Sequence, residues 1–231
     1  MKASKNAEIV AASKFAAKPA TKPAAKPVTK TTRKRLPPPP SKPYHHGNLR
    51  ESLLEAADEV LTTHGAAGIT LREVAKAAGV SHAAPYHHFA SLDDLLATVA
   101  ERGFKRLSAA LAPTREVVDS RERLMQISEI YVNCARAHPS QFRLMFGPLL
   151  SRKRQFPTLQ KAAEQSFGIV VEAATMLDKE RGMELALLGW SLCHGLSNLL
   201  IDGVFDGMPM QLPDAATLAR QLTQRALDGG G

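Results

Sequence analysis

The sequence holds little of what enzymes and metal proteins need. Its 231 residues include only two cysteines and one tryptophan, and aromatic residues make up 5%. No nucleophile, base and orienting group fall together, no glycine-rich loop fits a phosphate, and no zinc-ligand spacing occurs. Adjacent histidines at 45–46 and 87–88 point in different directions on a helix, and no cysteine or carboxylate completes a ligand set. These absences argue against an enzyme, a bound metal and any cofactor.

Long hydrophobic segments are also scarce. No apolar stretch approaches the roughly 18 residues that a membrane helix needs, and the N-terminus has no continuous apolar run of the signal-peptide kind. The two cysteines, Cys134 and Cys193, lie in apolar helical patterns, which are typical of buried thiols in a reducing compartment. We therefore expect a cytoplasmic protein without a membrane partner.

Positive charge is concentrated at the start of the chain. Residues 1–43 contain nine lysines, two arginines and one glutamate, a net charge of +10, whereas the whole chain carries +8. Residues 44–231 are therefore slightly acidic, at −2. The first segment is rich in Lys, Ala and Pro, so we expect a disordered basic tail. Such a tail either neutralises DNA phosphates without reading sequence or is a plain solvated extension.

Two short amphipathic segments lie around a glycine between Thr70 and Phe89. The first segment has apolar residues at i, i+3, i+4 and i+7, on one face of a helix: Leu71, Val74, Ala75 and Ala78. Gly79 then supplies a sharp turn, and Ser81 is placed to cap a second helix. This spacing predicts a helix-turn-helix that puts its second helix into a DNA groove.

Polar cap residues mark three helix starts in the same region. Asn48, Thr70 and Ser91 each precede a carboxylate by three positions, the pattern of a capping box. A helix that runs from Asn48 to Gly65 is expected to pack on the two DNA-reading helices. A linking helix follows from residue 91 to about residue 111, where a proline ends it. The prediction is a three-helix DNA-binding head.

Residues 47–107 resemble the DNA-binding domain of TetR-family transcriptional regulators. The resemblance rests on Ile-Thr-Leu-Arg-Glu-Val-Ala from Ile69, Ala-Gly-Val from Ala78 and Tyr-His-His-Phe from Tyr86. It implies DNA contacts from Thr70, Arg72, Ser81, His82, Ala83, Tyr86, His87 and His88. Two positions depart from the family pattern: Leu92 stands where many members have a phosphate-binding lysine, and Pro85 stands where a helix-forming residue is more usual.

The chain after Pro113 is long enough for a second all-helical domain. Helices are predicted over residues 120–137, 141–146, 158–179, 182–205 and 214–227, and no strand-like alternation competes. This half is similar to the ligand-binding and dimerisation domain of TetR regulators. Trp190, His194 and Gly195 match the Trp-xxx-His-Gly (WHG) signature of one C-terminal subtype. The resemblance implies a homodimer formed through the last two helices, and therefore an inverted-repeat operator.

Trp190 and His194 lie four positions apart, so they share a helix face. Either they line an apolar ligand pocket, or they pack in a plain core with His194 bonded to a backbone carbonyl. On the pocket interpretation the lining residues are Met125, Tyr131, Leu144, Met145, Phe146, Phe167, Trp190 and His194.

These features predict an all-α regulator with three parts: a basic tail at residues 1–43, a helix-turn-helix domain at 44–107, and a ligand-binding and dimerisation domain at 113–231. The expected function is sequence-specific repression, in which a dimer binds palindromic double-stranded DNA and an unidentified small molecule releases it. The alternative is a nonspecific, nucleoid-associated DNA-binding protein dominated by its basic tail.

Overall fold

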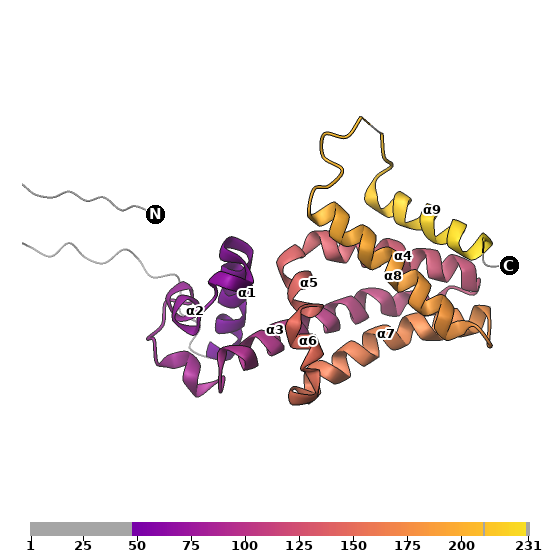
Figure 1. Ribbon diagram of the computed structural model, residues 1–231. Helices are drawn as coiled ribbons and strands as arrows, with labels where there is room; N and C mark the ends of the chain where they lie inside the picture. Colours follow the sequence, from indigo (N-terminus) through magenta and orange to yellow (C-terminus); the bar gives the residue numbers. More distant parts are fainter. Residues whose placement is uncertain (1–47, 210, 230–231) are drawn as a thin grey trace, which may run out of the picture. The chain divides into compact units, whose positions relative to one another are not determined.

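The structure is a computed structural model that describes residues 48–209 and 211–229 (Figure 1). The basic tail predicted for residues 1–43 lies outside this range. All regular elements in the described part are helical. The all-α prediction is therefore confirmed for the part of the chain that the structure describes.

The head begins with α1 (Leu49–Gly68) and α2 (Leu71–Ala77), followed by a short 3-10 turn, η1 (Ala84–His87). The side chains of Asn48, Thr70 and Ser91 accept hydrogen bonds from the backbone N–H groups three residues later, at 3.3, 3.1 and 3.1 Å. Each bond satisfies an N–H that the first helical turn leaves without a partner. The three helix starts predicted from the capping pattern are confirmed.

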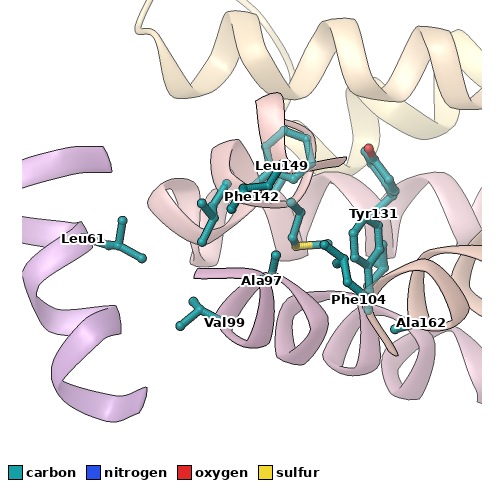
Figure 2. Close-up of a cluster of buried hydrophobic side chains, with 14 of the residues drawn as sticks. Leu61, Ala97, Val99, Phe104, Tyr131, Phe142, Leu149 and Ala162 are labelled. Atoms are coloured by element: carbon teal, nitrogen blue, oxygen red, sulfur yellow. The ribbon is translucent and has the colours of Figure 1, made fainter. Parts of the chain in front are cut away.

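One long helix, α3 (Leu92–Leu111), links the head to the rest of the described chain. Its first half buries Ala97 and Val99 and contacts α1, which carries Leu61, and its second half buries Phe104 near Tyr131 (Figure 2). The helix ends where expected, because Pro113 lies in the 3-10 turn η2 (Ala112–Glu116) that follows it.

The C-terminal domain is a bundle in which α4 contacts α7, α8 and α9, while α3 packs along α7. Its helices are α4 (Ser120–Ala137), α5 (Pro139–Met145), α6 (Pro148–Ser151), α7 (Pro157–Leu177), α8 (Gly182–Ile201) and α9 (Ala215–Asp228), with a 3-10 turn η3 (Lys153–Gln155) between α6 and α7. The predicted helix over 182–205 is too long. It ends at Ile201 because Gly203 takes a positive φ of 66°.

Gly103 allows α5 to lie close against α3. A Cβ atom at this position would lie 2.4 Å from Met145 Sδ and 2.8 Å from Met145 Cγ. Met145 is itself buried at 5% exposure, so its side chain has little room to move away. The absence of a side chain at Gly103 therefore sets the spacing of these two helices.

We expect Gly103→Leu to lower the free energy of unfolding by about 1–3 kcal/mol, because the new side chain overpacks the contact with Met145. Gly168→Leu on α7 is the matched control, since a Cβ there meets nothing within 4 Å. The control should keep or slightly raise stability through its better helix propensity. Urea unfolding of both variants checks this, and equal stabilities would show that the α3–α5 contact is not tight.

Candidate DNA-reading surface and apolar cavity

The turn between α2 and η1 is built by a glycine. Gly79 has a φ of +69°, a left-handed conformation that strains other residues. The Val80 N–H then donates to the Ala75 carbonyl at 3.0 Å, and Val80 packs against the head core. This turn directs residues 81–89 away from the axis of α2, as the sequence spacing predicts.

The second element of the motif is shorter than expected. The sequence predicts a helix capped by Ser81, but the structure has only the four-residue 3-10 turn η1, with no side-chain cap. The reason lies at Pro85, which disfavours the helical conformation of the residue before it and has no N–H to donate. Ala84, Pro85 and Phe89 are buried and fix the turn to the head. The head thus has two α-helices and a 3-10 turn before α3, a correction to the predicted three-helix arrangement.

The side chains proposed to contact DNA lie on the surface of the head. All eight are exposed: Thr70, Arg72, Ser81, His82, Ala83, Tyr86, His87 and His88. Tyr86 is a large aromatic side chain that is 66% exposed. Leu92 is partly buried and packs against the core, so it does not supply the phosphate contact of the lysine found at this position in many family members. Arg50, which the sequence motif does not mark, stacks over the Phe89 ring at 5.2 Å from its centroid.

A cavity of about 210 Å³ lies in the C-terminal domain between α3, α4, α7 and α8. It is lined by Phe104, Leu107, Leu111, Tyr131, Phe146, Ala163, Glu164, Ser166, Phe167, Val170 and Trp190. The rings pack against one another, with centroids of Phe167 and Trp190 5.5 Å apart and those of Phe104 and Phe146 5.3 Å apart. The walls are therefore mainly aromatic and aliphatic.

Four of the eight predicted pocket residues line this cavity: Tyr131, Phe146, Phe167 and Trp190. Met145 instead lines a smaller neighbouring void beside Gly103, and Met125 and Leu144 line neither space. The α3 residues Phe104, Leu107 and Leu111 were not predicted, because the sequence pattern marks that helix only as a linker between the two domains. Glu164 and Ser166 were also missed, since nothing in the local pattern marks them.

His194 lies behind the cavity wall in a chain of hydrogen bonds. Trp190 Nε1 donates to Tyr131 Oη at 3.2 Å, and Tyr131 Oη lies 3.0 Å from His194 Nδ1. Burial lowers the pKa of His194, so its ring is neutral near pH 7 and Nδ1 can accept the Tyr131 proton. Burial also raises the pKa of Tyr131 far above its usual value. His194 therefore bonds a side chain, and not the backbone carbonyl of the plain-core interpretation.

Comparisons with known proteins agree with this geometry. Residues 53–99 match the family of bacterial regulatory proteins named tetR, and residues 124–225 match the tetracyclin repressor-like C-terminal domain. The chain belongs to the TetR family. This family consists of DNA-binding transcriptional regulators and not of enzymes.

Several relatives of this TetR-family chain are nucleoid occlusion factors named SlmA. The protein from Marinobacter nauticus is 34% identical over 122 residues, which are 51% of this chain and 60% of that protein. The protein from Aliivibrio fischeri is 33% identical over 116 residues, 48% of this chain and 56% of that protein. The chain thus spans less than two thirds of the curated relatives that it matches.

Solved structures extend the likeness across both domains. A protein of unknown function from Rhodococcus sp. RHA1 is 31% identical with a TM-score of 0.67, covering 82% of this chain and 98% of that one. The TetR-family regulator PfmR from Thermus thermophilus is 24% identical with a TM-score of 0.55, covering 76% of this chain and 97% of that one. The second likeness shows the fold alone.

The head of this TetR-family protein is joined to its C-terminal domain through Gln141. The buried Gln141 amide donates to the Val99 carbonyl at 3.2 Å and to Asp58 Oδ1 of α1 at 3.4 Å, and it accepts from Arg106 at 2.6 Å. Burial raises the pKa of Asp58, although Arg102 and Arg106 oppose the shift. Gln141 belongs to α5, and the C-cap residue of that helix, Phe146, lines the cavity. One short helix therefore contacts both the cavity and the head.

The outer face of α8 is apolar. Leu187, Leu188 and Leu199 are 44%, 43% and 42% exposed, and a Cβ at Gly195 between them would meet nothing within 4 Å. By length and composition alone α8 is long and apolar enough to cross a membrane, which corrects the expectation that no stretch approaches this limit. Its inner face nevertheless packs on α4, α7 and α9, as in a bundle.

We expect Tyr131→Phe to lower the free energy of unfolding by about 1–3 kcal/mol, because it leaves the partly buried polar groups of Trp190 and His194 without their partner. Tyr86→Phe, which removes an exposed hydroxyl, is the control and should leave stability unchanged. Urea unfolding measures both. No loss for Tyr131→Phe would mean that the hydrogen-bond chain contributes nothing to the fold.

Proposed function

We propose that this TetR-family regulator is a repressor that binds an inverted-repeat operator as a dimer and is released by a small molecule bound in the apolar cavity. The observation that carries the proposal is that residues 81–89 divide into buried and exposed side chains. Their buried members anchor the turn, while the polar and aromatic members stay in solvent. A surface held rigidly but left free of intramolecular partners is suited to another molecule.

The proposed DNA contacts follow from position and chemistry. Thr70 and Arg72, at the start of α2, are suited to phosphates, because hydroxyl, guanidinium and helix N-terminal groups bind them. Tyr86 and the neighbouring histidines are suited to base edges and to the thymine methyl group. The body of the chain carries a net −2, so the basic tail is proposed to add phosphate contacts that depend on salt.

The dimer is proposed to form through α8 and α9. The α8 stripe, formed by the exposed Leu187, Leu188 and Leu199, leaves apolar side chains in water. Ser191 and Gly195 between them allow a second helix to approach closely. The outer positions of α9 are polar, including Gln221, Gln224 and Arg225, which suits the rim of an interface. Two copies related by a two-fold axis would present two heads to one operator.

Release by a ligand is proposed to act through α5 and α3. A ligand in the cavity contacts Phe104 of α3 and Phe146, the C-cap of α5, and Gln141 transmits a displacement of α5 to Asp58 in the head. In the dimer, one spacing of the two heads fits successive major grooves of DNA and another does not. Ligand binding lowers operator affinity only as far as the ligand binds the second arrangement more tightly than the first. The Trp-xxx-His-Gly subtype remains part of this proposal, with Trp190 at the cavity and His194 holding Tyr131.

A second candidate function is suggested by the relatives named nucleoid occlusion factors. In that case the protein would act on the nucleoid as a whole, in the cytoplasm, with sites that are not confined to promoters. The basic tail would carry a larger share of the binding than the head.

Selection of genomic fragments by the purified protein at about 0.15 M salt tests these functions. We expect an enriched inverted repeat upstream of a few genes. Tyr86→Ala should weaken binding to that repeat by about 1–3 kcal/mol, because a base contact is lost. Met176→Ala, which truncates a side chain 57% exposed on α7, is the control and should bind normally.

Other outcomes of the selection identify the second candidate or reject both. Repeats scattered over the chromosome would favour the nucleoid role. Uniform recovery of all fragments, lost when residues 1–42 are deleted and unchanged by Tyr86→Ala, would contradict sequence reading by the head.

We expect Gly195→Arg to convert the dimer to monomer and to weaken binding to the two-head operator at least tenfold, because the charged side chain projects from the middle of the α8 stripe. Gly168→Arg on α7 is the matched control, since a Cβ there is equally unhindered. Sedimentation equilibrium gives the mass of each variant, and circular dichroism shows whether it folds. A folded dimeric Gly195→Arg protein would place the interface elsewhere.

A further inference from the structure

The cavity has an aromatic wall of a kind that favours positive charge. Tyr131, Phe104, Phe146, Phe167 and Trp190 all line it. The faces of aromatic rings carry partial negative charge and attract cations, tryptophan most strongly. No lysine or arginine is among the described residues that line the cavity. A carboxylate or phosphate on a ligand would therefore find no countercharge there.

Glu164 is the one charged side chain among the described lining residues. It is exposed, whereas Tyr131 and Ser166 are buried, so Glu164 marks the mouth of the cavity. Gln160 Nε2 donates to its Oε1 at 2.8 Å, and no ion pair to it is found within residues 48–209 and 211–229. The carboxylate charge is thus left without a cationic partner one helical turn from Phe167.

The other polar groups at the cavity do not offset this charge. Tyr131 Oη already accepts from Trp190 and lies within hydrogen-bond distance of His194. His194 is neutral near pH 7, because burial lowers its pKa. The electrostatic character of the site is therefore set by one carboxylate and the ring faces.

We propose that the cavity binds a small lipophilic cation, an ammonium carried on a single aromatic ring, with its positive charge between Glu164 and the faces of Trp190 and Phe167. The inference rests on the proposal that the cavity is the effector site. The volume of about 210 Å³ lies below the range of about 300–1,000 Å³ for drug-sized ligands. This size fits a one-ring molecule and excludes a long acyl chain. The apolar inner wall receives the ring and the mouth receives the charge.

Three probes of similar size and different charge test the proposal in the absence of DNA. They are benzyltrimethylammonium, its neutral carbon isostere neopentylbenzene, and the anion 3-phenylpropionate. Trp190 is the one tryptophan in the sequence, so a change in its fluorescence reports binding at the cavity itself. Each probe is titrated into the native protein, Glu164→Gln and the control Glu180→Gln. Glu180 lies in the turn between α7 and α8, outside the cavity lining, and its substitution changes the net charge by the same amount.

The native protein should bind the cation at least about tenfold more tightly than the anion. Glu164→Gln should weaken binding of the cation severalfold, leave binding of the neutral isostere unchanged and strengthen binding of the anion. Glu180→Gln should change the affinity for none of the three probes. Equal effects of Glu164→Gln on all three probes, or anion binding as tight as cation binding, would overturn the proposal.

Two further outcomes separate this inference from the proposed function. If the Trp190 fluorescence responds to none of the probes while the protein still selects an inverted repeat, the cation site is wrong and the regulator function stands. If the cation binds as expected but no fragment is selected, the cavity assignment stands and the operator proposal fails.

Discussion

The rest of this structure depends on one helix that runs through the hydrophobic core shared by the head and the C-terminal domain. The first half of α3 buries Leu95, Ala97 and Val99 and contacts α1 of the head, and its second half supplies Phe104 and Leu111 to the wall of the cavity. A helix of 20 residues is about 30 Å long and moves as a unit. The same helix therefore carries side chains of both the head and the cavity wall. The proposed release by a ligand depends on this shared helix, because a displacement of α3 at the cavity would reach the head along it.

Two small features set how tightly that helix is held. Gly103 lets α5 rest on α3, and Gln141 of α5 bonds both the α3 backbone and Asp58 of α1. The amide is well suited to this position, because it donates and accepts while burying no charge of its own. Arg106 completes its hydrogen bonds, and α5 thus contacts both α1 and the cavity-lining helix α3.

The sequence predicted the helical class, the three capped starts and the extent of α3 and α4, because each depends on local patterns within a few residues. The prediction was wrong for the second element of the helix-turn-helix, where the sequence indicated a helix but Pro85 limits it to the 3-10 turn η1. It found half of its proposed pocket residues at the cavity. Glu164 and Phe104 were missed because a cavity is formed by residues that meet only in three dimensions. The short α6 was missed because four residues carry no periodicity. The resemblance to a family supplied the candidate DNA contacts, which local patterns alone do not assign.

The central claim is that the cavity and the head are thermodynamically linked. The most direct test is to titrate benzyltrimethylammonium, followed by Trp190 fluorescence, into the free protein and into the protein saturated with its selected operator fragment. The account predicts weaker cation binding in the operator complex, by the same factor by which the cation weakens operator binding. Equal affinities in the two states would contradict it, because a ligand that binds both states alike cannot shift their balance.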